Sequence, residues 1–224
     1  MSPSPLPTPA NGPSGNVYHN VFLTSPRVPS GQSHVQFTLS QEYFAIFGTP
    51  STHQDGNVVV HTSSYLPATL GPNGSFFTLS TVGGSASEPV WDQKAAQGKV
   101  TAASGGFTIA ADHSFEYPNS IYVGCGAQTN PPDANTVVPI QTYIAEPGLQ
   151  SQFFPRPKYY VTTGNYQPGT IVDLTTLGDV LQVDFTTSAV PEASFNLNSH
   201  GVFEADKSVG NNGVSWCFGS ISDA

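Results

Sequence analysis

Charged side chains are what this sequence has least of. Asp, Glu, Lys and Arg make up 9% of 224 residues, against roughly 25% in an ordinary soluble domain. Six residues in all are Lys or Arg, and the net charge is −9. Lys and Arg supply the main contacts to phosphate in nucleic-acid binding, so we expect no direct binding of nucleic acid. A surface with so few charges must be covered by hydroxyl and amide side chains.

Cysteines, a leader sequence and long apolar runs are scarce or missing as well. Cys125 and Cys217 are the only two cysteines, too few for a disulfide framework; we expect two free, buried thiols, and a single bridge between them is the alternative. Residues 1–16 lack the basic and apolar regions of a secretory signal. No run reaches the 18 apolar residues of a membrane helix, so we expect no membrane insertion. We find no targeting signal in the sequence, and its composition favours a location in a virion or on an extracellular surface.

Short segments rich in Val, Ile, Thr, Phe and Tyr follow one another, separated by turn residues. This pattern predicts an all-β fold, an antiparallel β-sandwich for which a jelly roll is one form. "SHVQFTLS" alternates, with Val35, Phe37 and Leu39 on one face. "EYFAIFG" is a continuous apolar run of the length of a buried strand. We expect at most one or two short helices, the best candidate being residues 87–99, with Ser87 as the N-cap and Gly98 at the end.

The chain divides into two parts by composition. Residues 1–16 contain prolines and glycines and a single large apolar side chain besides Met1, Leu6, which predicts an extended arm that is flexible or bound by a partner. No further boundary is visible, so residues 17–224 are expected to form a single β-sandwich domain.

The stretch 51–65 contains two histidines and an aspartate, and it offers either a metal site or a hairpin. Asp55-Gly56 is a strong signal for a two-residue turn. With that pair at the centre, His53 faces Val58, and His53 and His61 lie on opposite faces of the ladder. We therefore expect no shared metal ion; a facial triad of His and Asp ligands for iron is the alternative.

Signatures of catalysis are also missing. There is no G-x-S-x-G elbow, no phosphate-binding loop and no dinucleotide fingerprint. The six glutamates are scattered, and the sequence does not pair any two of them across a cleft. We predict that the protein is not an enzyme, with no catalytic residue, no cofactor and no metal.

Aromatic residues provide the remaining functional signal. "FFPRPKYYV" places two of the six positive charges within three residues, between pairs of rings. Such a loop is a candidate ligand-binding or interface site, and the alternative is a proline-stiffened crossover with its rings in the core. The candidate contact residues are Phe153, Phe154, Arg156, Lys158, Tyr159 and Tyr160. Trp91 and Trp216 are able to stack on a sugar, although Trp216, beside Cys217 and Phe218, is expected in the core.

These features favour a structural protein that assembles with other copies of itself. A viral capsid or outer-shell subunit, or a subunit of a surface fibre, packing through neutral polar surfaces has this character. The alternative is a lectin-like β-sandwich module that binds glycans. An enzyme that uses a metal or a pair of carboxylates on a β-scaffold ranks last.

Overall fold

β-Strands form nearly all the regular structure of this protein. The structure is a computed structural model that describes residues 2–3, 17–25, 34–53, 55–81, 89–101, 104–113, 121–130, 137–189, 192–208, 211 and 213–221. Within these ranges there is one α-helical turn, α1 (Gln93–Ala96), and one short 3-10 helix, η2 (Leu174–Thr176). None of the helices in these ranges is long and apolar enough to cross a membrane.

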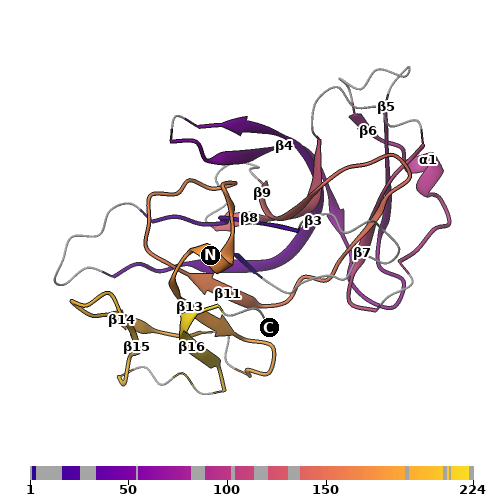
Figure 1. The fold of residues 1–224 in the computed structure, drawn as a ribbon. Coiled ribbons are helices and arrows are strands. Elements are labelled where there is room, and N and C mark those ends of the chain that lie inside the picture. Colours follow the sequence, from indigo (N-terminus) through magenta and orange to yellow (C-terminus); the bar gives the residue numbers. More distant parts are fainter. Residues whose placement is uncertain are drawn as a thin grey trace.

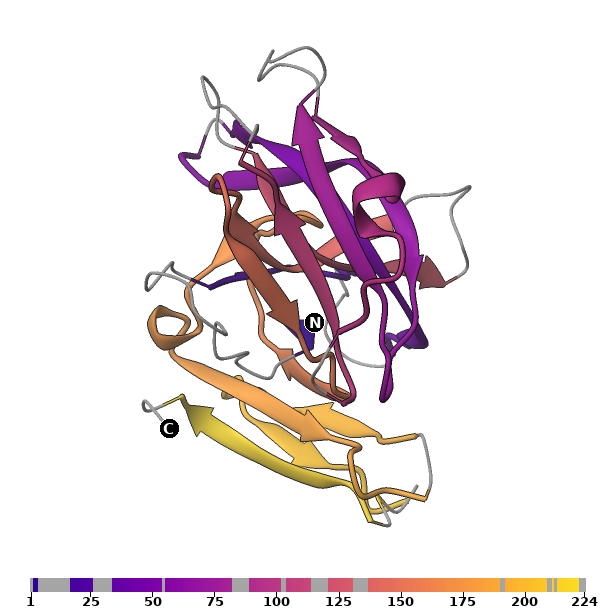
Figure 2. The same cartoon turned by 90° about the vertical axis from the view of Figure 1, so that its right-hand side faces the viewer.

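Two β-sheets, here called the first and the second, form the body of the molecule (Figures 1 and 2). The first sheet is antiparallel and contains, in spatial order, β12 (Ile171–Val172), β2 (Tyr18–Asn20), β9 (Val137–Ile144), β8 (Tyr122–Asn130), β3 (Thr38–Thr52) and β4 (Val58–Ala68). The second contains β10 (Gln150–Phe153), β7 (Phe107–Ala111), β5 (Phe76–Thr81) and β6 (Pro89–Trp91). Its β5–β7 pair is parallel, whereas β10–β7 and β5–β6 are antiparallel. The predicted all-β, antiparallel sandwich is thus confirmed, with one parallel pair.

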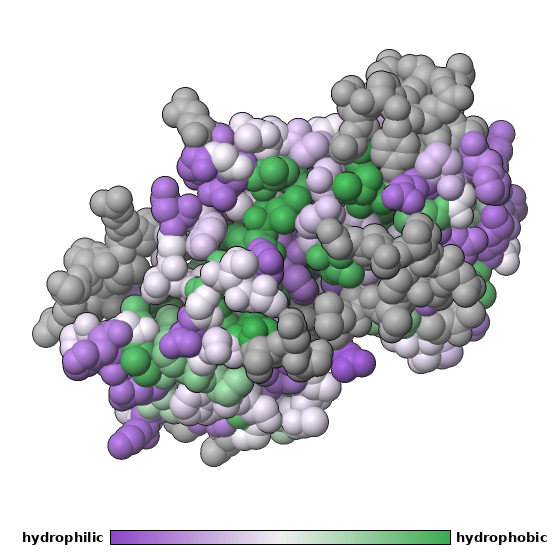
Figure 3. Space-filling view, in the orientation of Figure 1, coloured by the Kyte–Doolittle hydropathy of each residue, from purple (hydrophilic) through white to green (hydrophobic). Residues whose placement is uncertain are grey.

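A third sheet lies along one end of this body, at the bottom of Figure 2. Its order is β1 (Ser2–Pro3), β11 (Lys158–Val161), β13 (Asp179–Asp184) and β16 (Ser215–Ser220). The hairpin of β14 (Phe195–Leu197) and β15 (Phe203–Ala205) adjoins it. The surface over this end mixes pale and green residues with purple ones (Figure 3), as expected for a chain with few charges.

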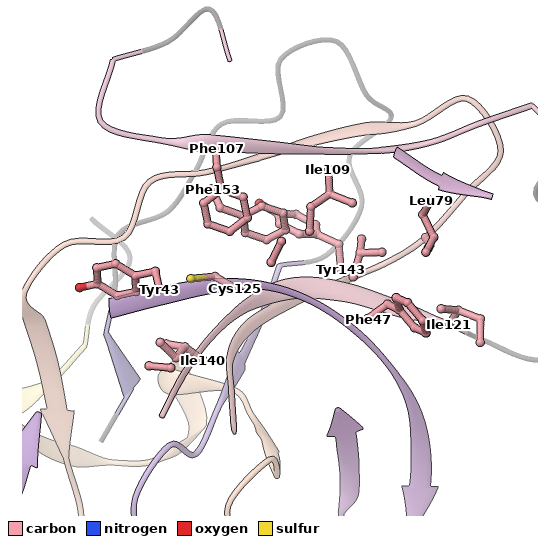
Figure 4. Packing of buried hydrophobic residues seen from close by; sticks show 14 of the residues in the cluster. Tyr43, Phe47, Leu79, Phe107, Ile109, Ile121, Cys125, Ile140, Tyr143 and Phe153 are labelled. Carbon is pink, nitrogen blue, oxygen red and sulfur yellow. The ribbon is translucent and has the colours of Figure 1, made fainter. Parts of the chain in front are cut away.

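The main core lies between the first two sheets (Figure 4). In β3, Tyr43, Ala45 and Phe47 belong to this core, while the alternate residues Phe44 and Ile46 belong to a second cluster. The run "EYFAIFG" therefore buries both faces of one strand, as its continuous apolar character predicts. Each fully buried large side chain contributes about 1.5–3 kcal/mol to stability.

The third sheet has a hydrophobic cluster of its own. Leu181, Val183 and Val214 are buried there, and Phe195 and Phe203 of the adjoining hairpin pack against them. The prediction of a single domain for residues 17–224 stays a prediction. Of the predicted arm, Ser2 and Pro3 pair with Tyr160 and Tyr159 of the same chain, and residues 1 and 4–16 lie outside the described residues.

The β3–β4 hairpin forms where Asp55-Gly56 predicts it, but its register differs by one residue. The His53 amide donates to the Asn57 carbonyl at 2.8 Å, and Thr49 pairs with His61. His53 and Asn57 are therefore joined by three residues of the chain, 54–56. Gly56 has a φ of +85°, which suits a three-residue connection. Since the step from residue 53 to residue 49 is an even number, His53 and His61 lie on the same face. The expectation of opposite faces is wrong.

Two other predicted elements are also corrected. The helix begins five residues later than expected for a Ser87 cap, because Pro89–Trp91 pairs with β5 as β6 and Asp92 is the N-cap. "SHVQFTLS" is not a strand of its own: regular pairing begins at Thr38 as part of β3, and Val35 is 41% exposed.

Both cysteines are free, as predicted, but only one is buried. Cys125 lies in the main core and Cys217 is exposed on β16. Trp216 is 40% exposed, so its expected place in the core is wrong. The cause is the position of β16 at the end of the third sheet, where it pairs with β13 on one side.

Candidate functional site

A pocket opens between β4, β5, β6 and α1. Its volume is about 380 Å³, within the range of roughly 300–1,000 Å³ that small-molecule sites occupy. The residues that line it are Leu66, Pro67, Phe76, Phe77, Thr78, Trp91, Asp92, Gln93, Ala96 and Gln97.

Trp91 forms a fixed aromatic wall of this pocket. Its indole Nε1 donates to the Ser64 hydroxyl at 3.2 Å. The ring centroid lies 5.1 Å from that of Phe47 and 5.7 Å from that of Phe77, which are the tilted contacts that aromatic pairs prefer. Trp91 thus packs partly against the main core and also lines the pocket.

Asp92 fixes the helical turn that carries the polar rim of the pocket. Its Oδ1 accepts from the amides of Lys94 and Ala95, both at 3.0 Å, and its own amide donates to the Thr78 carbonyl at 2.8 Å. These bonds hold α1 against β5. The amide side chains of Gln93 and Gln97 are exposed at this rim.

Thr78 contributes a buried hydroxyl that has no hydrogen-bond partner in the structure. The residue is 4% exposed and lines the pocket from β5. An unsatisfied buried polar group costs about 1–3 kcal/mol. A group with that cost, at the wall of a pocket, is a candidate for a bond to a ligand or to a water molecule that a ligand holds.

The arrangement offers an apolar aromatic surface, two amides, one carboxylate and one hydroxyl. Lys99 lies beside one lining residue, with its Nζ 5.4 Å from the centroid of the Phe76 ring. This chemistry suits a neutral ligand with both an apolar face and many hydroxyls. Among the described residues, no three His, Cys, Asp or Glu side chains gather as a metal site requires.

The histidines of the hairpin have separate partners. His61 Nε2 lies 2.7 Å from the Ser51 hydroxyl, and His53 Nδ1 lies 3.9 Å from Asp55 Oδ1. The bond from the Asn57 amide is the largest influence on Asp55, and together with His53 it lowers the pKa of that carboxyl. The absence of a shared metal ion stays a prediction, since the parity argument for it does not hold.

The contact residues predicted from "FFPRPKYYV" separate into two groups. Phe153 is fully buried, with its ring stacked on Phe107 at 5.1 Å between centroids. Tyr159 is buried against Phe185 at 6.0 Å, and burial raises the pKa of its hydroxyl. The side chains of Phe153 and Tyr159 therefore belong to the cores, as the crossover alternative predicts.

The other four predicted residues remain at or near the surface. Arg156 is exposed, while Phe154, Lys158 and Tyr160 are partly exposed. Lys158 Nζ lies 5.8 Å from the Tyr160 centroid, and Lys158 pairs across the sheet with Asp184. Burial raises the pKa of the Asp184 carboxyl, but bonds from Thr186 and the two cations outweigh it, so the pKa is lowered. A binding role for these four residues stays a prediction.

Comparison with known families adds one finding. The model of the RhiA family matches residues 7–208, which is most of the chain. The chain belongs to the RhiA family. Neither a curated protein nor a solved structure matches it, so membership of the RhiA family indicates by itself neither a ligand nor a reaction.

Sequence reasoning about this RhiA-family chain found one of the pocket residues and missed the others. Trp91 was a candidate for stacking on a sugar, but assigning residues 87–99 to one helix concealed that Trp91 is in a strand. Thr78 stands between the apolar residues Phe77 and Leu79 in "SFFTLSTV", a run with three other hydroxyl residues. The polar residue among apolar neighbours was the available signal, although it does not reveal that the hydroxyl lacks a partner.

Proposed function

We propose that this chain is a carbohydrate-binding β-sandwich module and that a neutral sugar occupies the pocket beside Trp91. The observation that carries the proposal is the combination of a fixed indole wall with the amides of Gln93 and Gln97 in one pocket. Sites of this kind have mostly apolar walls and a few placed polar groups.

The chemistry of a sugar matches these walls. A pyranose ring has an apolar face of C–H groups, which can pack on an indole, and a rim of hydroxyls that donate and accept hydrogen bonds. Glutamine side chains provide both a donor and an acceptor, and Asp92 Oδ1 is already used by the α1 cap. The low charge of the chain favours neutral over anionic sugars.

Fluorescence of Trp91 provides a direct test. The chain has two tryptophans, so Trp216→Phe leaves Trp91 as the single reporter and keeps an aromatic ring beside Phe195. Titration of this variant with a panel of neutral mono- and oligosaccharides should give a saturable change in emission for at least one sugar. Adding Gln93→Ala and Gln97→Ala should weaken binding about tenfold, as expected for the loss of one or two hydrogen bonds.

Gln36→Ala is the matched control, because Gln36 is exposed and lies outside the pocket. It should leave the affinity unchanged. No saturable change with any sugar of the panel, or the same loss with Gln36→Ala as with the pocket variants, would reject the proposal.

Self-assembly as a structural subunit is the second candidate. The exposed Trp216 on the last strand of the third sheet favours it, as does the scarcity of charge on the chain. A capsid, an outer shell or a fibre as the form of the assembly stays a prediction, as does the absence of an enzymatic activity.

A further inference from the structure

β16 is the open edge of the third sheet. The sheet ends with β1 beside β11 on one side and with β16 beside β13 on the other. Among the strands that the structure describes, none pairs with the outer side of β16. Within the described part of the chain, the backbone donors and acceptors on that side form no strand ladder, and an open ladder is what another extended segment pairs with.

The sequence of β16 lacks the features that usually protect an edge strand. Proteins place charges, prolines or bulges on open edges to prevent pairing with other chains. "SWCFGS" contains neither a charge nor a proline. All six residues pair with β13 without a shift of register, so no bulge interrupts the strand.

The distribution of charge favours a second copy of β16 as the segment that pairs with this edge. Two copies with a net charge of −9 repel each other, and the repulsion is smallest where neutral surfaces meet. β16 is neutral along its whole length, and the nearest acids on its sheet are Asp179 and Asp184 of β13, opposite Ser220 and Ser215. Two joined β16 strands would hold the acids of the two copies three strand spacings apart, roughly 14 Å. This exceeds the Debye length of about 8 Å at physiological salt.

We propose that β16 pairs with β16 of a second copy, antiparallel about a two-fold axis, to form one continuous sheet. The proposal rests on the self-assembly candidate and names its contact. A two-fold axis normal to the sheet pairs residues that lie on the same face, and with Phe218 at the axis Trp216 lies opposite Ser220 and Cys217 lies opposite Gly219 of the second copy. A Cβ at Gly219 would meet nothing within 4 Å, so the Cys217 side chain has room over it. Two-fold symmetry makes this contact twice.

The pairing requires no disulfide bond. With Phe218 at the axis, Cys217 lies opposite Gly219 of the second copy and not opposite the other Cys217. Cys217→Ser should therefore keep the association, which separates strand pairing from oxidation of an exposed thiol.

Sedimentation velocity over a concentration series tests the contact. Trp216→Lys removes the ring and adds a charge to the edge. Val100→Lys is the matched control, since Val100 is 54% exposed and lies outside the third sheet. We expect the wild type, Cys217→Ser and Val100→Lys to dimerise, and Trp216→Lys to have a dimer dissociation constant raised about 30-fold or more, as for an interface hot spot. Added salt should strengthen the dimer, because both copies are acidic.

The outcomes separate the contact from self-association in general. If the wild type dimerises and Trp216→Lys dimerises equally well, the β16 contact is rejected and self-association stands. A wild type that stays monomeric at about 100 µM or above rejects both. If Trp216→Lys fails to fold, hydrogen exchange of the wild type decides: residues 215–220 should be protected at high concentration and lose that protection on dilution, and equal exchange at both concentrations rejects the contact.

Discussion

His19 is a buried titratable side chain in the first sheet. It lies in β2 between Gln141 of β9 and Val172 of β12, is 8% exposed, and its Nδ1 has no hydrogen-bond partner in the structure. Burial lowers the pKa of His19 from its ordinary value of 6.5, although the nearby carboxylate of Asp173 acts in the opposite direction. The neutral imidazole is therefore the form that fits the fold.

The stability of the protein should fall as the pH is lowered below about 6.5. Because the pKa is lower in the folded state, the unfolded chain binds the proton more readily, and the contribution of His19 is complete above pH 6.5 and lost below it. The difference between wild type and His19→Gln should change by at most about 1.4 kcal/mol per pH unit. Urea unfolding from pH 7 to pH 5 measures this.

His200→Gln is the control for that experiment, because His200 is exposed in the turn between β14 and β15. The free energy of unfolding of His200→Gln should depend on pH in the same way as that of the wild type. Parallel curves for the wild type and His19→Gln over this range would contradict the assignment.

Thr78→Val should separate stability from binding at the pocket. Replacing an unpartnered hydroxyl with a methyl group of the same shape is neutral or stabilising, so the free energy of unfolding should rise by up to about 1–2 kcal/mol. Sugar binding should weaken if the ligand uses the hydroxyl, directly or through water. Urea unfolding and the Trp91 titration measure the two effects.

Thr101→Val is the control, since the Thr101 hydroxyl is buried and donates to the Ser75 carbonyl at 2.7 Å. It should destabilise the protein by about 1 kcal/mol. An equal loss of stability in both valine variants would indicate that Thr78 has a partner.

At the scale of elements, apolar pattern and turn chemistry predicted most of the strands, and their limits explain the errors. The run around Tyr43–Phe47 was predictable because a strand buried on both faces needs apolar residues at every position. The hairpin register was not, because Asp55-Gly56 fits both two-residue and three-residue connections. The helix start was misplaced because Ser87-x-Pro89 and Asp92 are both acceptable N-terminal signals, and only pairing with β5 decides between them.

Asp92→Ala should loosen α1 and the polar rim of the pocket. The Asp92 carboxylate caps the amides of Lys94 and Ala95, and the loss of such a cap costs about 0.5–2 kcal/mol. Asp92→Asn should keep most of this stability, because an amide oxygen accepts the same bonds. Urea midpoints measure the effect, and a midpoint of Asp92→Ala equal to that of Asp92→Asn would show that the cap contributes nothing.

At the scale of the whole molecule, the site could be predicted only in part. Trp91 could be named as a candidate because the chain has only two tryptophans. Its neighbours in the pocket could not, because they come from β4, β5 and α1 and are separated by as many as 31 positions in the chain. Sequence alone does not reveal which sheets face each other. The same limit applies to the third sheet, where β11, β13 and β16 are brought together over some 60 residues, leaving Trp216 at an edge.

Deleting residues 1–16 should leave the stability of an isolated subunit nearly unchanged. The described part of this arm makes two residue pairs with β11, and one of them is Pro3, which has no amide to donate. One or two net hydrogen bonds are worth about 0.5–1.5 kcal/mol each, and a chain of this size loses about 2–4 °C in Tm per kcal/mol. The main core, by contrast, begins with Val17 and Phe22. Calorimetry of the deletion variant should therefore give a Tm only a few degrees lower, with an unchanged unfolding enthalpy per residue. A variant that is unfolded at room temperature would mean that the arm is part of the core and that the division at residue 17 is wrong.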